Sequence, residues 1–357
     1  MNQAILNSRE KIKKLDTQNM LGSLELLGKQ VEQITSGKRF ALPKAYTQVR
    51  NVVVLGMGGS TLGSHVIKAL YASSLGVPVD IVNGYHVPAS VTENTLVIVS
   101  SYSGTTEEPV AAGKEALAKK AKVITISSGG TLKIWAEKNK IPAFLFTTEN
   151  NPCGSPRMGL GYSIVGQLLI FAAAGLITFG DKEIKIILTT ISKYEALFGV
   201  DTPSAHNFAK ALAWGTVGKT VWYAASEHLA GNVHIGANQM NENAKRFGGY
   251  FVVPELNHHL MEGLLYPKTN TQNLLFVFVE SNLYDKRIQK RYEIGKQILD
   301  QRKIAAVSYI AQEKNALAQV FEVLLFTSFA SYYSALLEGI DPTAIPVVDF
   351  FKAQLKK

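Results

Sequence analysis

The sequence of 357 residues predicts an α/β protein of two consecutive units, each a parallel sheet flanked by helices on both faces. Two observations carry this prediction. Short apolar runs rich in β-branched residues alternate with segments of helix length, as expected for parallel strands covered on both faces. The alternation occurs twice, before and after a mixed stretch at 181–203. We therefore expect an N-terminal helical segment at 1–37, a first domain at 38–180, and a second domain at 181–357 with a C-terminal helix.

The elements follow in order. Residues 1–35 have the apolar spacing of a helix, which Ser36 and Gly37 would end. The predicted strands of the first unit are Asn51–Leu55, Val79–Val82, Thr95–Ser100, Lys122–Ile126 and Ala143–Thr147. Those of the second unit are Thr220–Ala224, Tyr250–Val253, Leu274–Val279 and Ala305–Ile310. A long helix from about Ala316 to Leu337 and a short amphipathic helix, Ile345 to Leu355, complete the chain. A ligand is expected at the carboxyl ends of the strands or between the units.

The chain is expected to be a cytoplasmic protein that does not span a membrane. The apolar run from Tyr162 to Gly180 approaches the length of a membrane span, but Gln167 interrupts it, so a buried helix is expected. The N-terminus is polar and contains acids, unlike a signal peptide. The single cysteine, Cys153, excludes an intrachain disulfide and suits a reducing compartment.

The formal net charge of +9 raises the question of nucleic acid binding. The lysines and arginines are scattered, and their short clusters read as solvated helix faces. No basic stripe interleaved with aromatic residues and no zinc-finger spacing is present. An enzyme for an anionic metabolite explains the charge more simply, because surplus positive charge raises the association rate of an anionic substrate.

Two segments after predicted strands carry small and hydroxyl residues. Gly56–Ser60 follows the first strand, and glycines there let the backbone approach a ligand next to a helix N-terminus. Ser101–Thr106 follows the third strand and consists mostly of hydroxyl residues, which form a compact phosphate cradle of neutral donors. A capping box of Thr105 with Glu108 is the simpler interpretation of the second segment, although it uses only one hydroxyl. The sequence matches neither the glycine fingerprint of dinucleotide-binding proteins nor the Walker motif of ATP-binding proteins.

With three further motifs, these segments resemble the bifunctional phosphoglucose/phosphomannose isomerase family of sugar-isomerase (SIS) domain proteins. The matching segments are Gly56–Ser60, Ser101–Glu108, Pro156–Ser163, Asn241–Lys245 and Pro254–His258, with Leu15–Leu21 and Gly339–Lys352 at the two ends. The resemblance therefore covers nearly the whole chain in order. The most selective match is Asn-Glu-Asn-Ala-Lys with His258 sixteen residues beyond its glutamate.

The resemblance implies two SIS domains and assigns roles to individual residues. The implied phosphate ligands are Ser60, Ser101, Ser103 and Thr106, beside a substrate-binding loop containing Gly58 and Gly59. The implied catalytic residues are Arg157 beside the reacting carbons, Glu242 as base, and His258 and Lys352 at the ring oxygen. In relatives the histidine comes from the neighbouring subunit, which implies a homodimer with shared sites. Departures at Thr61, Thr105 and His259 leave the catalytic set intact and bear on sugar preference.

Isomerisation of an aldose to a ketose independently needs these residue types. A carboxylate such as Glu242 can move a proton between C2 and C1 through an enediol. An imidazole and an ammonium group can shuttle the proton of ring opening. A guanidinium such as Arg157 can hold the developing negative charge. No cofactor is needed, and no metal site is expected, because the side chains of the adjacent His258 and His259 diverge on most backbones.

The leading hypothesis is an isomerase for glucose 6-phosphate and fructose 6-phosphate, with mannose 6-phosphate as a candidate further substrate. One alternative is a non-catalytic SIS module that senses a sugar phosphate, which would not need Glu242 or His258. Another is a ketose–aldose isomerase of a different SIS branch. Each of Glu242, His258 and Lys352, taken alone, would ordinarily be a surface residue. Their occurrence together in matching order favours the enzyme.

Overall fold

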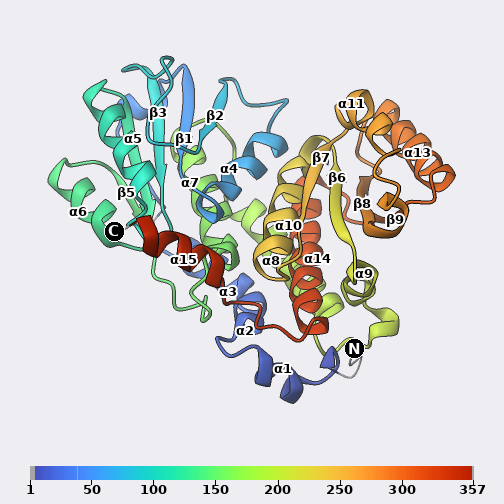
Figure 1. The fold of residues 1–357 in the computed structure, drawn as a ribbon. Coiled ribbons are helices and arrows are strands. Elements are labelled where there is room, and N and C mark those ends of the chain that lie inside the picture. Colours follow the sequence, from blue (N-terminus) through green and yellow to red (C-terminus); the bar gives the residue numbers. More distant parts are fainter. Residues whose placement is uncertain (1–4, 38, 356–357) are drawn as a thin grey trace.

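The computed structural model describes residues 5–37 and 39–355 and confirms the predicted fold class (Figure 1). Two wholly parallel sheets are present, with strand orders β2-β1-β3-β4-β5 and β7-β6-β8-β9. The first sheet contains β1 (Asn51–Leu55), β2 (Val79–Val82), β3 (Thr95–Ser100), β4 (Lys122–Ser127) and β5 (Ala143–Leu145). The second contains β6 (Thr220–Ala225), β7 (Gly248–Val252), β8 (Leu274–Ser281) and β9 (Ala305–Ala311). The predicted strands agree with these bounds to within two residues at either end.

Helices connect the strands and cover both sheets (Figure 1). The helices up to the end of the first sheet are α1 (Arg9–Leu15), α2 (Met20–Glu25), α3 (Leu27–Thr35), α4 (Gly59–Leu70), α5 (Glu107–Ala118) and α6 (Gly130–Lys138). A π-helical turn, Gly161–Val165, then leads into α7 (Gly166–Ala173) and α8 (Asp181–Phe198). The later helices are α9 (Phe208–Thr216), α10 (Ala230–Glu242), α11 (Leu256–Gly263), α12 (Asn270–Asn273), α13 (Lys286–Gln301), α14 (Ala316–Leu337) and α15 (Pro346–Leu355). Short 3-10 turns lie at Lys44–Thr47, Pro156–Met158, Ser204–His206 and Glu227–Leu229.

The N-terminal segment contains three short helices, whereas the sequence predicted continuous helical spacing over residues 1–35, of which 1–4 lie outside the described part. Asn19 interrupts the helix with a φ of 58°. The buried Asp16 carboxylate accepts hydrogen bonds from the backbone of Met20 and of Leu21, each at 2.7 Å. It also accepts one from the Tyr332 hydroxyl at 2.9 Å. The break is therefore made by a buried acid that ties this segment to α14.

The stretch from 162 to 203 departs from the prediction. The buried helix ends at Ala173 and does not continue to Gly180, because Gly175 adopts a φ of +72°, the left-handed conformation that commonly ends helices. The region read as mixed, 181–203, contains the eighteen-residue helix α8. Its buried positions include Ile187, Ile191, Tyr194 and Phe198, which follow helical spacing.

One continuous apolar core joins the two units. Side chains from one face of the first sheet and from the second sheet belong to the same buried cluster, and a smaller cluster covers the opposite face of the first sheet. Helix α14 is central to this core. By length and composition alone it could cross a membrane, with a mean hydropathy of 1.5, but its apolar window is entirely buried inside the protein. Its apolar character therefore matches a core helix.

Helices α4 and α10 make close contact across the boundary between the units. A Cβ atom at Gly231 would lie 2.6 Å from backbone atoms of His65 and of Val66, so only glycine permits this approach. The ring of His65 lies edge-on to that of His234 at 4.3 Å, and His234 stacks on Tyr250 at 4.6 Å. The two units are thus in contact through backbone as well as aromatic rings.

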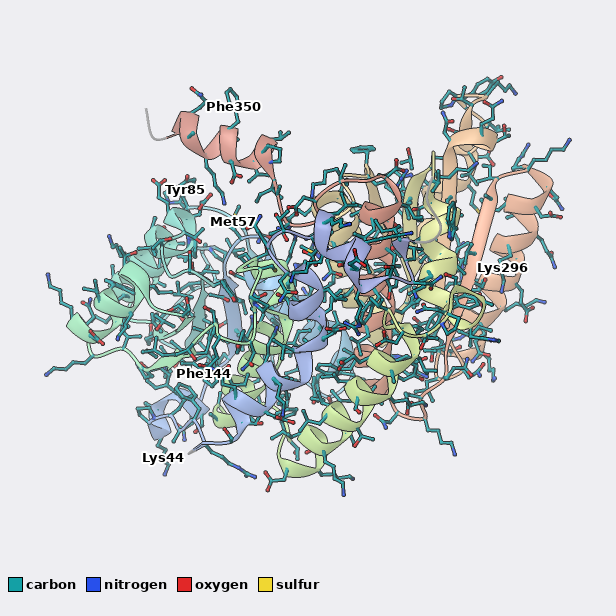
Figure 2. The ribbon with its side chains drawn as sticks, turned by 90° about the horizontal axis from the view of Figure 1, so that it is seen from below. Lys44, Met57, Tyr85, Phe144, Lys296 and Phe350 are labelled. Carbon is teal, nitrogen blue, oxygen red and sulfur yellow. The ribbon has the colours of Figure 1, made fainter. Side chains whose placement is uncertain are left out.

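The C-terminal helix α15 contrasts with the core. None of its residues is buried, and Val347, Phe350 and Phe351 are 80, 66 and 60% exposed. Figure 2 labels Phe350 and shows this helix standing off from the rest of the ribbon. Within the chain, the position of α15 is therefore set at its N-terminal end.

The two units differ at topologically equivalent helix starts. In the second unit, β8 leads into α13, whose N-cap Asp285 accepts a hydrogen bond from the backbone of Arg287 at 2.8 Å. The Glu227 carboxylate, from a residue with a φ of 44°, accepts another from the backbone of Asp285 at 3.1 Å. In the first unit, β3 leads into α5, and no side chain caps that helix.

The glycine contact between α4 and α10 generates a stability prediction. Gly231→Ala should lower the free energy of unfolding by about 1–3 kcal/mol, because the methyl group overlaps backbone that cannot rotate away. The matched control is Gly295→Ala in α13, where the nearest atom to the added Cβ lies 3.8 Å away. That variant should be unchanged or more stable by up to about 1 kcal/mol. Denaturant unfolding of both variants provides the measurement, and equal stabilities would contradict the contact.

Candidate active site

Hydroxyl side chains gather in the turn between β3 and α5. The buried Ser101 hydroxyl donates to that of Thr106 at 2.9 Å and accepts from the backbone of Gly104 at 3.1 Å. The exposed Ser103 hydroxyl lies 2.9 Å from that of Thr105. The turn is thus held by its own hydroxyls, with Ser101 inside and Ser103 facing solvent.

A second loop, residues 128–131, supports this turn and was not identified from the sequence. A Cβ atom at Gly104, which has a φ of +70°, would lie 1.9 Å from the carbonyl oxygen of Gly129. Ser128 and Thr131 donate side-chain hydrogen bonds to the carbonyls of Tyr102 and of Gly104, at 2.8 and 2.9 Å. In the sequence, the Ser-Gly-Gly-Thr pattern after the fourth strand is the feature from which this loop could have been identified.

The capping box of Thr105 with Glu108, the alternative interpretation of this segment, is not formed. Helix α5 begins at Glu107, its N-cap is Thr106, and no side chain bonds to its first turn. Thr105 instead bonds to Ser103. The first backbone N–H groups of a helix have no partner within the helix, so an uncapped start is suited to an anion.

The glycine-rich loop after β1 connects this turn with a second group of residues. The Ser60 hydroxyl accepts a hydrogen bond from the backbone of Tyr102 at 2.9 Å, which places it against the turn. Gly58 has a φ of +50° and a ψ of −126°, a conformation available to glycine. A Cβ atom at Gly59 would lie 2.9 Å from the carbonyl carbon of Pro156 and 3.0 Å from the backbone nitrogen of Arg157. The loop therefore touches both the hydroxyl turn and Arg157.

The guanidinium of Arg157 is buried and bonds to two separate segments, 242–243 and 342–343. Its Nε donates to Asn243 Oδ1 at 2.6 Å, and its Nη1 donates to Glu242 Oε2 at 3.1 Å. Its Nη2 donates to the carbonyls of Pro342 and of Thr343, at 3.1 and 2.9 Å. A buried charge needs such a set of acceptors, because an unpaired one is costly.

Glu242 is the last residue of α10 and lies at the open side of this group. Its side chain is 35% exposed, whereas that of Arg157 is 3% exposed. Burial lowers the pKa of Arg157 from its ordinary value, and the Glu242 carboxylate acts in the opposite direction. The guanidinium stays charged at neutral pH, because its ordinary pKa lies far above that range.

Buried amides position the Arg157 segment, and the sequence did not single them out. Gln239 Nε2 donates to the carbonyl of Arg157 at 3.0 Å, and Asn243 Nδ2 donates to Ser331 Oγ on α14 at 3.0 Å. Gln30 on α3 donates to the carbonyl of Met158 at 3.1 Å. These residues are far apart in the chain, so only the fold brings them to one place.

His258 and Lys352 are not brought to this group. His258 is exposed on α11, and its side chain has no hydrogen bond or ion pair to any other described residue. Lys352 is exposed on α15 and is equally without such a partner in the described part of the chain. One chain therefore assembles the hydroxyl turn, Arg157 and Glu242, but not the full implied set. In residues 5–37 and 39–355, no three His, Cys, Asp or Glu side chains cluster as a metal site requires.

Comparisons with known proteins agree with this architecture. Residues 45–143 match the SIS domain model, and residues 205–355 match the model of the bacterial phospho-glucose isomerase C-terminal SIS domain. A bifunctional phosphoglucose/phosphomannose isomerase from Caldicellulosiruptor bescii is 32% identical over 325 residues, which cover 89% of this chain and 93% of the relative. The chain belongs to the bifunctional phosphoglucose/phosphomannose isomerase family. A member from Thermoplasma acidophilum is 29% identical, over 85% of this chain and 89% of its own.

Solved structures show that the fold of this phosphoglucose/phosphomannose isomerase family member extends to more distant proteins. A hypothetical protein from Thermus thermophilus has a TM-score of 0.73 at 17% identity, covering 99% of this chain and 94% of its own. A glucose-6-phosphate isomerase like protein from the same organism has a TM-score of 0.63 at 17% identity, covering 96 and 99%. The fold of this chain therefore recurs in proteins of low sequence identity.

The two ends of this family member meet beside the site. Thr17 Oγ1 donates to Asp341 Oδ2 at 2.6 Å, and Asp341 Oδ1 accepts from the backbone of Thr343 at 2.7 Å. Thr343 is one of the residues whose carbonyl binds Arg157. The two terminal segments that resemble the family, Leu15–Leu21 and Gly339–Lys352, are thus joined to each other, and the second of them binds Arg157.

The different environments of Ser101 and Ser103 predict different effects of substitution on stability. Ser101→Ala should lower the free energy of unfolding by about 1–1.5 kcal/mol, because the buried hydroxyl loses its hydrogen bonds with Thr106 and Gly104, while the Gly104 N–H keeps the carbonyl of Ser101 as an acceptor. Ser103→Ala, at an exposed position, should change it by no more than about 0.5 kcal/mol. Thermal or denaturant unfolding of the two alanine variants measures the difference. A larger loss for Ser103→Ala would show that the interior position is misassigned.

Proposed function

We propose that this protein interconverts glucose 6-phosphate and fructose 6-phosphate, with mannose 6-phosphate as a further substrate. The observation that carries the proposal is the pairing of a buried guanidinium, Arg157, with a half-exposed carboxylate, Glu242, next to an uncapped helix start lined by hydroxyls. Relatives over nearly the whole chain are named for the same pair of activities. The cytoplasm is the proposed location, in keeping with the single cysteine.

The phosphate is assigned to the turn between β3 and α5. Ser60, Ser101, Ser103 and Thr106 supply neutral hydroxyls, and the uncapped backbone N–H groups at the start of α5 favour an anion. Gly58 and Gly59 let the first loop approach the substrate closely. Because Gly59 also touches Arg157, a sugar whose phosphate lies in the turn has its carbons directed toward the second group.

The proton transfer is assigned to Glu242. Once the ring is open, its carboxylate takes the proton from C2, a double bond forms between C1 and C2, and the aldehyde oxygen takes up the negative charge. The same group returns the proton to C1, while the C2 hydroxyl proton moves to the C1 oxygen and C2 becomes the ketone. Arg157 stabilises the charge on the enediolate oxygens, since a preorganised cation in a buried site lowers the energy of such an intermediate. Glucose and mannose 6-phosphates give the same planar enediol, so one base can serve both.

Ring opening is assigned to His258 and Lys352. One proton leaves the anomeric hydroxyl and one reaches the ring oxygen, so that the bond between C1 and the ring oxygen breaks. An imidazole and an ammonium group suit these transfers. Because neither side chain contacts Arg157 or Glu242 within one chain, we further propose a homodimer in which a second copy supplies His258. The exposed apolar residues of α15, including Phe350 and Phe351, support an association that covers them.

The direct test is a coupled assay of the purified protein with each hexose 6-phosphate, together with the variant Glu242→Gln. We expect the wild type to turn over glucose and fructose 6-phosphates. The amide keeps the size of the carboxylate but removes its basicity, so kcat should fall by ~10² to 10⁴-fold with KM little changed. Exchange of the C2 proton with deuterium oxide should fall in parallel. Near-full turnover and exchange in Glu242→Gln would show that another group is the base.

The shared site is tested by mixing two inactive variants. Glu242→Gln and His258→Ala proteins, each inactive alone, should regain part of the wild-type activity when their subunits exchange, because half of the sites in a heterodimer then hold both intact groups. Mixing each variant with itself is the control. Absence of recovery, where mass spectrometry shows that heterodimers have formed, would mean that each site is built from one chain.

A further inference from the structure

Lys245, in the Asn-Glu-Asn-Ala-Lys segment, has no role in the function derived above, yet its ammonium group binds next to the site. Its Nζ donates to the carbonyl of Asp341 at 2.7 Å and to that of Pro342 at 3.1 Å. A third hydrogen bond goes to the carbonyl of Asn243, also at 3.1 Å. An ammonium group has three donors and no acceptor, so all three are used within the protein. Lys245 therefore has no free proton to offer a phosphate or a ring oxygen in this arrangement.

The acceptors of Lys245 belong to the segment from which α15 leaves the body of the protein. We call residues 341–343 the α15 root. Arg157 binds the same root, because its Nη2 donates to the carbonyls of Pro342 and of Thr343. The carbonyl of Pro342 is shared by both cations. Three successive carbonyls are thus held by two positively charged side chains.

Within one chain, the α15 root sets the direction in which α15 leaves the body of the protein. All residues of α15 itself are exposed, so its own packing within the chain does not fix its direction. Asp341 adds a further contact to the root through its bond from Thr17. A change of backbone direction at the root moves the far end of a ten-residue helix, on which Lys352 lies.

We propose that Lys245 is a positioning residue that, together with Arg157, fixes the α15 root and thereby the position of Lys352 relative to Glu242. This inference rests on the proposed isomerase function for the reaction it assists. Lys245 acts through the root and does not touch the substrate. The backbone around it is adapted to this task, since Lys245 itself has a φ of 51°, which brings its ammonium group back over the end of α10.

The charge of Lys245 gives the arrangement a pH dependence. Partial desolvation of the ammonium group among these carbonyls lowers the pKa of Lys245 to about 8, although the residue as a whole is exposed; Arg157 acts in the same direction, whereas Asp341 and Glu242 oppose it. Above that pH the neutral amine has two N–H donors for three carbonyls, so its hold on the root weakens and activity should fall. The pH dependence of folding stability has the opposite direction. The unfolded chain binds the proton up to its ordinary pKa, so this group favours the folded state increasingly as pH rises from about 8.

Lys210 on α9 provides a comparison that makes the same number of hydrogen bonds, although it is fully buried whereas Lys245 is exposed. Its Nζ also makes three hydrogen bonds, to Asn7 Oδ1 and to the carbonyls of Val200 and of Thr202, at 2.7–2.8 Å. Burial likewise lowers the pKa of Lys210 to about 8. The acceptors of Lys210 all lie outside the α15 root. A purely structural loss of a lysine is therefore represented by Lys210→Met.

The test compares Lys245→Met, Lys245→Arg, Lys210→Met, Lys352→Met and the double variant Lys245→Met/Lys352→Met, with kcat and KM for glucose 6-phosphate measured on both sides of pH 8. Lys245→Met should lower kcat by about tenfold to a hundredfold, as displaced catalytic groups do, with KM within about twofold. The decline of kcat above pH 8 should disappear in Lys245→Met and move to higher pH in Lys245→Arg. Lys210→Met should keep the wild-type kcat and its decline.

The double variant decides whether Lys245 acts through Lys352. If it does, Lys245→Met/Lys352→Met should be no slower than Lys352→Met alone, because the loss of Lys352 already removes the group through which Lys245 acts. Any of three results would overturn the proposal. The loss of kcat in the double variant could equal the product of the two single losses, Lys245→Met could raise KM with kcat unchanged, or Lys210→Met could lose as much kcat as Lys245→Met. Hydrogen exchange of the backbone amides of Ile340, Asp341 and Thr343 gives a readout without substrate: it should accelerate in Lys245→Met and not in Lys210→Met. A wild type without isomerase activity would refute the proposed function, whereas unchanged exchange at these three amides would refute the hold on the root.

Discussion

The site depends on one buried guanidinium. Arg157 has acceptors at the end of α10 and in the segment before α15, while its own backbone is held by Gln239. Removing one partner of a buried charge typically costs about 3–5 kcal/mol, so these segments cannot separate without a large penalty. Only one of the four acceptors of Arg157 is a carboxylate, and the others are neutral oxygens. The neutral acceptors keep the cation in place whatever Glu242 does during a reaction.

The hydroxyl turn between β3 and α5 is built on a different principle. It contains no cation among its own residues, and its shape comes from hydroxyl bonds and from glycines that permit close approach, as where Gly104 meets Gly129. A neutral cradle at a helix start binds an anion through many weak donors, which allows release as well as binding. The two parts are joined where Gly59 contacts the backbone of Arg157. Binding and chemistry are therefore assigned to separate groups in rigid contact.

Much of the fold could be predicted from the sequence, because strands buried on both faces leave continuous β-branched runs. Helix α8 was missed, since its apolar positions are diluted by lysines and threonines, and the capping box failed because Thr105 bonds to Ser103 instead. Gly59, Arg157 and Glu242 were identified and lie together. No role was predicted for Gln239 or Lys245, because each binds backbone carbonyls that are distant in sequence, and a carbonyl is the same in every residue type. The places of His258 and Lys352 relative to Glu242 stay a prediction, since they involve no contact within one chain.

The capped start of α13 has a consequence for how the two halves share their work. Where the first unit presents an open helix start, the second presents one that already holds acidic groups, from Asp285 and Glu227. These fixed anions occupy the electrostatic position of a phosphate, and a second phosphate would have to displace them against like charge. Of these two equivalent helix starts, only that of the first unit is open to an anion. In the proposed function the second unit contributes the Glu242 carboxylate at the end of α10 instead, so two similar folds would have different roles in one reaction.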